Sequence, residues 1–221
     1  FDRKTGKTLW TATEERASYS SPVAATIDGQ RHIVFATRLK VVSVDPVNGR
    51  VLFEFPFGEL GPSATGASPL VLGNSIFITG SYRFGAVLAR AGHSGALEVW
   101  RSDEILSSQY TTSIAYDEML FGVHGRQDSA PAELRCVNPI TRQVIWKKSS
   151  FGYATMILAD DKLLIMKTDG ELILAAADTQ KYRELARANL FDGTTTRALP
   201  SLSNGLFYVR DGKTLKCFDL R

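Results

Sequence analysis

Long apolar runs and clusters of basic residues are both missing from this sequence. No apolar stretch approaches the roughly 18–20 residues that a membrane-spanning helix needs, so we expect no membrane span. The net charge is only +3, and no five basic residues stand together. Proteins that bind nucleic acid usually carry a concentrated basic patch. The sequence therefore argues against a nucleic-acid partner.

Signatures of common catalytic and metal sites are also missing. His32, His93 and His124 do not have the close spacing of zinc ligands, and we expect them on the surface or in loops. The sequence has no glycine-rich phosphate loop followed by a helix and no G-x-S-x-G turn. These observations indicate neither a nucleotide-binding loop nor a hydrolase nucleophile.

The composition that remains is that of a folded protein. Hydrophobic residues make up 44% and charged residues 22% of the 221 positions, which is ordinary for a globular chain. The sequence begins at Phe1 without methionine, and its first ten residues resemble neither a signal peptide nor a transit peptide. We expect an N-terminally truncated piece of a larger ring, although a ring closed by the N-terminal strand is the alternative.

A short motif recurs with a period of about 43 residues. An Asp-like residue is followed by a turn, a glycine four positions later, and a strand that ends in Trp or Phe. The copies span residues 2–10, 45–53, 91–100 and 138–146, with an eroded fifth at 176–184 and a partial sixth ending at Asp219.

The chemistry of the motif is that of a hairpin. Asp or Asn accepts hydrogen bonds from amides two residues on, and glycine tolerates positive φ. The aromatic residue then lies on an outer strand and is expected to pack against the neighbouring repeat. Two more strand-like runs precede each motif, so each period supplies four short strands. Residues 175–190 have a helical composition, but their place in the repeat predicts a strand.

The pattern A-x-D-x-x-T-G-x-x-x-W resembles the repeats of pyrroloquinoline-quinone-like (PQQ-like) β-propellers, best at residues 2–10, 45–53 and 138–146. The resemblance implies an all-β propeller of four-stranded antiparallel blades. We expect one domain over residues 1–221 with about five blades, as part of a ring of seven or eight. The predicted blades span residues 18–55, 66–101, 110–148, 153–187 and 198–221, and residues 1–10 are expected to form the outer strand of a truncated or ring-closing blade.

The family includes bacterial outer-membrane assembly scaffold lipoproteins and quinoprotein dehydrogenases, so it implies two functions. The first is a non-catalytic, exported scaffold in the periplasm or outside the cell that binds a protein or polymer and needs no cofactor. A lipid anchor upstream of residue 1 is compatible with it. The alternative is an alcohol or sugar dehydrogenase that depends on PQQ and calcium, with its site mostly in blades outside this sequence. We assign no catalytic, cofactor or metal residue, because turn formation already explains most acidic side chains.

Cys136 and Cys217 each lie two positions before the Asp-like residue of their motif. Ser43 and Ala89 hold that place in other blades, so the position is expected to favour small side chains that pack between blades. We predict two buried free thiols rather than a disulfide.

One set of residues is a candidate partner-binding face. Tyr and Arg are enriched at binding hot spots, and several fall just before the predicted innermost strand of a blade or in a loop expected on the same side. The competing interpretation is that each tyrosine simply packs on the adjacent blade. The candidate residues are Tyr19, Tyr82, Arg83, Tyr110, Arg126, Tyr153 and Arg197.

Overall fold

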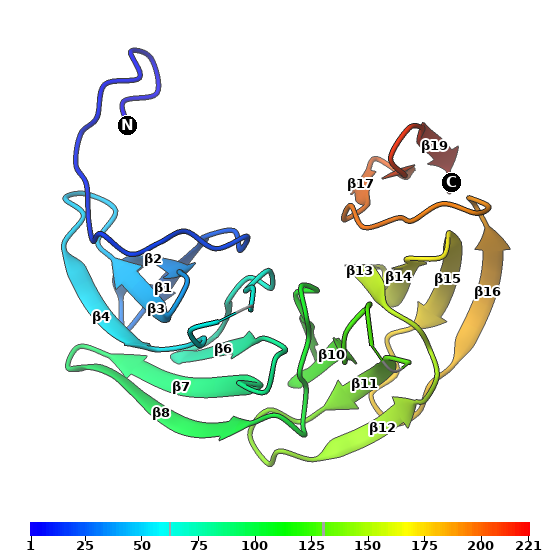
Figure 1. Ribbon diagram of the computed structural model, residues 1–221, viewed down its shortest axis with the longest axis horizontal. Coiled ribbons are helices and arrows are strands. Elements are labelled where there is room, and N and C mark those ends of the chain that lie inside the picture. The colour runs from blue at the N-terminus through cyan, green and yellow to red at the C-terminus, as the bar shows by residue number, and fades with distance from the viewer. Residues whose placement is uncertain (62, 130) are drawn as a thin grey trace. The chain divides into compact units, whose positions relative to one another are not determined.

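The computed structural model describes residues 1–61, 63–129 and 131–221, and these ranges contain strands and turns but no helix. The strands form five antiparallel sheets in which each strand pairs with the next along the chain (Figure 1). The fold is thus all-β with about five propeller blades, as the repeat predicted. The chain divides into two compact units, residues 1–112 and 113–221, which are described separately.

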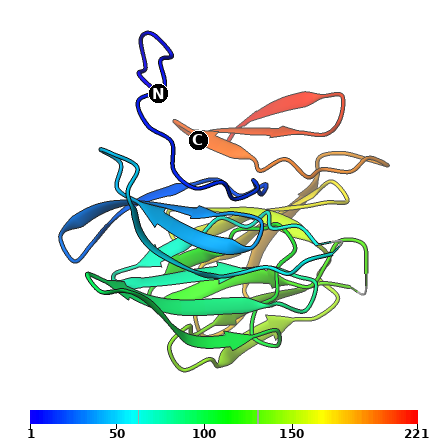
Figure 2. The same ribbon diagram turned by 60° about the vertical axis from the view of Figure 1, so that its left-hand side comes forward.

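Unit 1 contains blades 1 and 2, whose facing sides are stacked (Figure 2). Val34, Phe53 and Phe55 of blade 1 pack with Ile76, Ile78 and Val87 of blade 2, and all six are buried. Burial of such side chains stabilises the stack by roughly 1.5–3 kcal/mol each. Blade 1 comprises β1 (Val23–Ile27), β2 (Gln30–Ala36), β3 (Lys40–Val44) and β4 (Val51–Pro56), and blade 2 comprises β5 (Leu70–Leu72), β6 (Ser75–Thr79), β7 (Ala86–Gly92) and β8 (Gly95–Ser102).

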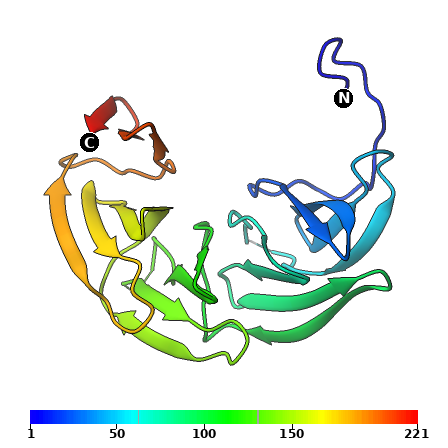
Figure 3. The same ribbon diagram turned by 180° about the vertical axis from the view of Figure 1, so that it is seen from behind.

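Unit 2 contains blades 3, 4 and 5, seen from behind in Figure 3. Leu164 and Met166 of blade 4 form a buried cluster with Phe207 and Val209 of blade 5. Blade 3 comprises β9 (Ile114–Tyr116), β10 (Met119–His124), β11 (Glu133–Val137) and β12 (Val144–Lys148); blade 4 comprises β13 (Ala154–Ala159), β14 (Lys162–Lys167), β15 (Glu171–Ala176) and β16 (Glu184–Asn189); blade 5 comprises β17 (Ser201–Ser203), β18 (Leu206–Arg210) and β19 (Leu215–Asp219).

The predicted turns between third and fourth strands form as their chemistry requires. The Asp45 carboxylate accepts the Val47 amide at 2.8 Å, and the Asn138 side chain accepts the Ile140 amide at 2.8 Å. The same turn forms at Asp2, where the carboxylate accepts the Lys4 amide at 3.1 Å. The structure nevertheless assigns no strand before Val23, so the outer strand expected within residues 1–10 is not observed.

A β-bulge in each of blades 1 to 4 fixes which residues of the third and fourth strands face each other. In blade 1 the bulge lies between Ser43 and Val44 and sets Ser43 opposite Phe53. The same position in the next blades pairs Leu88 with Trp100 and Cys136 with Trp146, whereas blade 4 pairs Leu174 with Ala186. We call these four fourth-strand residues, Phe53, Trp100, Trp146 and Ala186, the outer-strand row.

Trp10 and Trp146 dock on the turn of the following blade, as predicted for the aromatic position. The Trp10 indole Nε1 donates to the carbonyl of Pro46 at 3.2 Å. Trp146 Nε1 donates to the carbonyl of Asp178 at 2.9 Å. At these two places the ring lies on the turn of the following blade, and its polar N–H is satisfied there by a backbone carbonyl.

Two motif copies differ from the regular turn. In blade 2 the β7–β8 ladder continues to Gly92 opposite Gly95, so no Asp-type turn forms there, and Leu88 rather than the predicted Ala89 occupies the place of Ser43. In blade 4 the closing bond runs from the Ala176 amide to the Arg183 carbonyl at 2.9 Å. That loop is longer than in blade 1, and Asp178 supplies its capping carboxylate. The strand predicted in place of a helix near residues 175–190 is confirmed as β16.

The structure corrects two predictions of burial. Both cysteines are free, and Cys136 is buried as predicted, but Cys217 is exposed. Cys136 faces blade 4, where its thiol lies 3.9 Å from the carbonyl of Thr179, and burial raises the pKa of this thiol to about 12. His32 was expected on the surface; instead it is buried in β2, with Nδ1 2.8 Å from the Ser43 hydroxyl. Burial lowers the pKa of His32, which favours the neutral ring.

Candidate partner-binding face

The segments that lead into the first strand of each blade repeat one pattern, and we call them entry segments. Within unit 1 they lie side by side and are hydrogen-bonded to one another. The Tyr19 amide donates to the Thr65 carbonyl at 2.9 Å. The Ser21 amide donates to the Ser68 hydroxyl at 3.1 Å, and the Ser68 amide donates to the Thr112 hydroxyl at 2.8 Å. A backbone amide donates each of these bonds, to a carbonyl in the first and to side-chain hydroxyls in the other two. The bonds hold the segments in fixed order along one edge of the blades.

Aligned on these bonds, Tyr19, Gly66 and Tyr110 occupy the same place in three successive entry segments. The Tyr19 side chain is 85% exposed. At the second place only glycine fits, because a Cβ on Gly66 would lie 2.7 Å from the Cβ of Tyr110. Tyr110 therefore packs against the preceding segment and is only partly exposed.

The loop between β6 and β7 brings two more predicted residues to this edge. The Tyr82 hydroxyl accepts a hydrogen bond from Gln109 Nε2 at 3.1 Å, beside Tyr110. The Tyr82 ring lies over Phe84 with centroids 6.4 Å apart. Tyr82 and Arg83 have φ angles of 65° and 74°, a conformation that costs energy for residues other than glycine. Arg83 is exposed at the tip of this loop.

In unit 2 the structure brings Arg126 and Arg197 to the same place, although they are far apart in sequence. Arg197 Nε donates to Gln127 Oε1 at 2.8 Å. The neighbouring Arg126 forms a bidentate pair with Asp128 at 2.8 and 2.6 Å. The hydrogen bond from Arg126 lowers the pKa of Asp128. The arrangement presents guanidinium groups and a carboxylate at the surface, which suits polar recognition of a partner.

Tyr153 stands apart from the other predicted residues. It comes directly before β13, but its side chain is only 3% exposed. Its carbonyl accepts the Thr168 amide at 2.9 Å, which ties the β14–β15 turn to the entry segment. The ring of Tyr153 is therefore buried and is not part of an exposed face.

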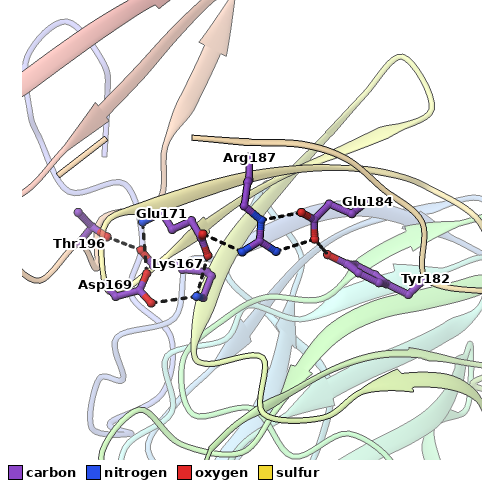
Figure 4. A network of polar contacts seen from close by, with 7 residues as sticks. All are labelled: Lys167, Asp169, Glu171, Tyr182, Glu184, Arg187 and Thr196. Atoms are coloured by element: carbon purple, nitrogen blue, oxygen red, sulfur yellow. Dashed lines mark hydrogen bonds and ion pairs between the residues drawn. The ribbon is translucent and has the colours of Figure 1, made fainter. Parts of the chain in front are cut away.

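A polar network that sequence reasoning missed crosses the outer part of blade 4 (Figure 4). Lys167 Nζ lies 2.9 Å from both Asp169 and Glu171. Glu171 also contacts Arg187 at 2.9 Å, and Arg187 contacts Glu184 at 2.6 Å. The hydrogen bond from Arg187 lowers the pKa of Glu184 to about 2. In the sequence, only the spacing of four residues between Lys167 and Glu171 indicates that this pair of opposite charges could meet. It does not indicate that Arg187 of the neighbouring strand joins them.

Tyr182 ends the network. Its hydroxyl donates to Glu184 at 2.8 Å, and its ring lies 5.9 Å from Trp146 and 6.1 Å from Phe151. Burial, together with this carboxylate, raises the pKa of Tyr182. Since each charge in the network has an opposite charge beside it, the arrangement fastens strands together rather than offering a group poised for proton transfer.

Within the described ranges, no group of three or more His, Cys, Asp or Glu side chains is arranged to hold a metal ion. In the same residues, no helix is long and apolar enough to cross a membrane.

Comparison with known proteins agrees with the blades and the motif. The model of the PQQ_2 family, described as outer membrane protein assembly factor BamB, matches residues 1–148. The chain belongs to this BamB family. Among curated protein sequences, none matches the chain.

Solved structures similar to this chain include BamB from Moraxella catarrhalis, with a TM-score of 0.63 and 14% identity over 94% of this chain and 59% of that one. The β-propeller domain of Cps50 (Swd1) from Myceliophteria thermophila gives a TM-score of 0.65 at 13% identity, over 89% of this chain and 69% of that one. The computationally designed protein Ika8 gives 0.66 at 12% identity, over 97% and 62%. At such identities the likeness shows the propeller fold alone. This BamB-family chain spans 59% of the length of the Moraxella protein.

Proposed function

We propose that this protein is a non-catalytic scaffold that binds a protein or polymer partner through its entry segments and the adjoining loops. The observation that carries the proposal is the hydrogen-bonded row of entry segments, which holds an exposed tyrosine on a rigid edge. Rigid frames that carry recognition on their loops are common among binding proteins. Aromatic and arginine side chains supply much of the energy of such interfaces.

Membership of the BamB family indicates the kind of partner to seek. The family description names outer membrane protein assembly, and we propose a protein of that process as the partner. The same description supports an exported protein that acts in the periplasm or outside the cell. Cell fractionation of the source bacterium tests this location, and recovery in the cytoplasm alone would contradict it.

The binding proposal is tested by capturing partners from an envelope extract of the source bacterium on the immobilised protein. We expect a defined envelope protein to be retained by the wild type and lost, by about tenfold or more, from a Tyr19→Ala/Arg197→Ala double variant. Both side chains are exposed, so the variant should unfold at the wild-type temperature.

A matched control changes the exposed Val47 to alanine, because this residue lies in the turn between β3 and β4, away from the entry segments. Capture should be unaffected by Val47→Ala. Equal retention by the wild type, the double variant and the control would remove the entry segments from the binding surface.

A further inference from the structure

Blade 4 is the exception in the outer-strand row. Three blades place Phe53, Trp100 or Trp146 in the row, whereas Ala186 stands in blade 4, opposite Leu174. An alanine fills far less space than an indole, so the surface beside it is left uncovered. The structure has a groove at this place.

The groove has a volume of about 460 Å³ and is lined by residues of blade 4, from β13 to β16, and by residues of blade 5. This volume falls within the range of small binding pockets. Its walls are mainly apolar, although Asp160, Lys162 and Arg187 also line it. The larger apolar contributions come from Leu164, Leu172, Leu174, Leu202 and Leu220, together with Ala186. Leu164, Leu172, Leu174 and Leu202 also belong to the apolar cluster that joins blades 4 and 5. The groove is thus the unfilled end of an existing interface between two blades.

The docked tryptophans show what kind of group fits such a place. Trp10 and Trp146 each lay an indole on the following turn and donate Nε1 to a backbone carbonyl there. In blade 1 that carbonyl belongs to Pro46, directly after Asp45. In blade 5, Leu220 directly follows Asp219 and lines the groove. Leu220 therefore holds in the groove the motif position that Pro46 holds in blade 1.

We propose that the groove at Ala186 receives the tryptophan side chain of a partner polypeptide. Strand β16 pairs with β15 on one side, and among the described residues no strand pairs with its other edge. An extended segment can add to such an edge by main-chain hydrogen bonds while one side chain enters a neighbouring pocket. This site is separate from the entry segments and does not depend on the function proposed above.

The test uses a peptide with the sequence of residues 143–148, which contains Trp146 in its natural strand context, and a matched peptide with alanine at that tryptophan. Binding to the intact chain is followed by NMR of the methyl groups of Ala186, Leu174 and Leu202. We expect the tryptophan peptide to shift these signals in a saturable way and the alanine peptide to bind about tenfold more weakly or worse.

Two variants make the site specific. Ala186→Trp fills the groove from within the chain and should abolish the shifts, and Ala186→Phe serves the same purpose if the larger ring prevents folding. The control is Ala115→Trp, which adds an indole at an exposed position of β9 and should leave peptide binding unchanged.

Any of several results would overturn the proposal. They are the absence of shifts with the tryptophan peptide, equal binding of the two peptides, and unchanged binding by folded Ala186→Trp or Ala186→Phe. Binding of free indole without binding of the peptide would also overturn it, because the groove would then take a small molecule and not a polypeptide.

Discussion

The glycine at position 49 is required by its neighbour as well as by its turn. Its φ is 74°, in the region that favours glycine. A Cβ added there would lie 2.5 Å from Cε3 of Trp10. The turn glycine of the motif and the tryptophan of the preceding copy are therefore two halves of one contact.

We predict that Gly49→Ala is more destabilising than a positive φ alone explains. The matched control is Gly29→Ala, since Gly29 has a φ of 78° and nothing within 4 Å of an added Cβ. Chemical denaturation should show a free energy of unfolding lower by about 1–2 kcal/mol in Gly49→Ala than in Gly29→Ala. Replacing Trp10 by alanine as well should remove this difference. Equal losses in the two single variants would mean that the indole adapts without cost.

At the scale of strands, charged pairs join the third and fourth strands of several blades. Lys40 of β3 contacts Glu54 of β4 at 2.8 Å, and Glu133 contacts Lys147 of β12 at 3.1 Å with the signs reversed. Burial opposes ionisation of Glu133, but hydrogen bonds from Arg135, Lys147 and Ser149 outweigh it and lower its pKa to about 2. The ionised Glu133 thus stabilises blade 3.

The lowered pKa of Glu133 predicts the direction of a pH effect. Its contribution to stability is present above the pKa of about 4.5 expected in the unfolded chain and is lost as the pH falls towards 2. Between pH 5 and pH 2.5 the wild type should lose about 1–2 kcal/mol more stability than Glu133→Gln. Denaturant titrations at several pH values measure this, with Glu14→Gln, a change at an exposed residue, as the control. Parallel pH profiles of wild type and Glu133→Gln would contradict the prediction.

The sequence predicted those elements whose chemistry is local. The turns at Asp45 and Asn138 need only their own side chains and the amides two residues on. The turn predicted at residue 91 does not form. The bulge between Leu88 and Ala89 sets a register in which β7 and β8 stay paired as far as Gly92 and Gly95. Repeat spacing within one strand cannot reveal which residue of the partner strand it will face.

The candidate site was predictable only in part, for a related reason. Equivalent positions in the repeat correctly placed Tyr19 and Tyr110 in the entry segments. The contact of Arg197 with Gln127 joins residues 70 positions apart, and no local pattern contains it. The burial of Tyr153 depends on the residues that the adjoining segments place around it. The groove beside Ala186 likewise depends on residues of several other strands.

For the whole molecule, the scaffold proposal and the quinoprotein alternative predict opposite results in one titration. We expect that PQQ with calcium will neither bind the full-length protein stoichiometrically nor support dye-linked oxidation of alcohols or sugars. Absorbance of the quinone and dye reduction measure the two effects, and a known quinoprotein dehydrogenase serves as the positive control. Tight binding with turnover would instead establish an enzyme whose site lies mostly outside these 221 residues.

The two cysteines differ in their accessibility to an alkylating agent, so they can serve as a built-in footprinting pair. Cys136 and Cys217 occupy the same place in their motifs, yet blade 4 covers the first thiol while the second is open to solvent. The rate at which Cys217 is alkylated therefore reports whether anything covers the side of blade 5 that carries this thiol. Cys136 provides the protected reference in the same molecule. Applied inside living cells, this internal comparison would show whether that face is occupied there, by another part of the polypeptide or by a bound protein, without any engineered label.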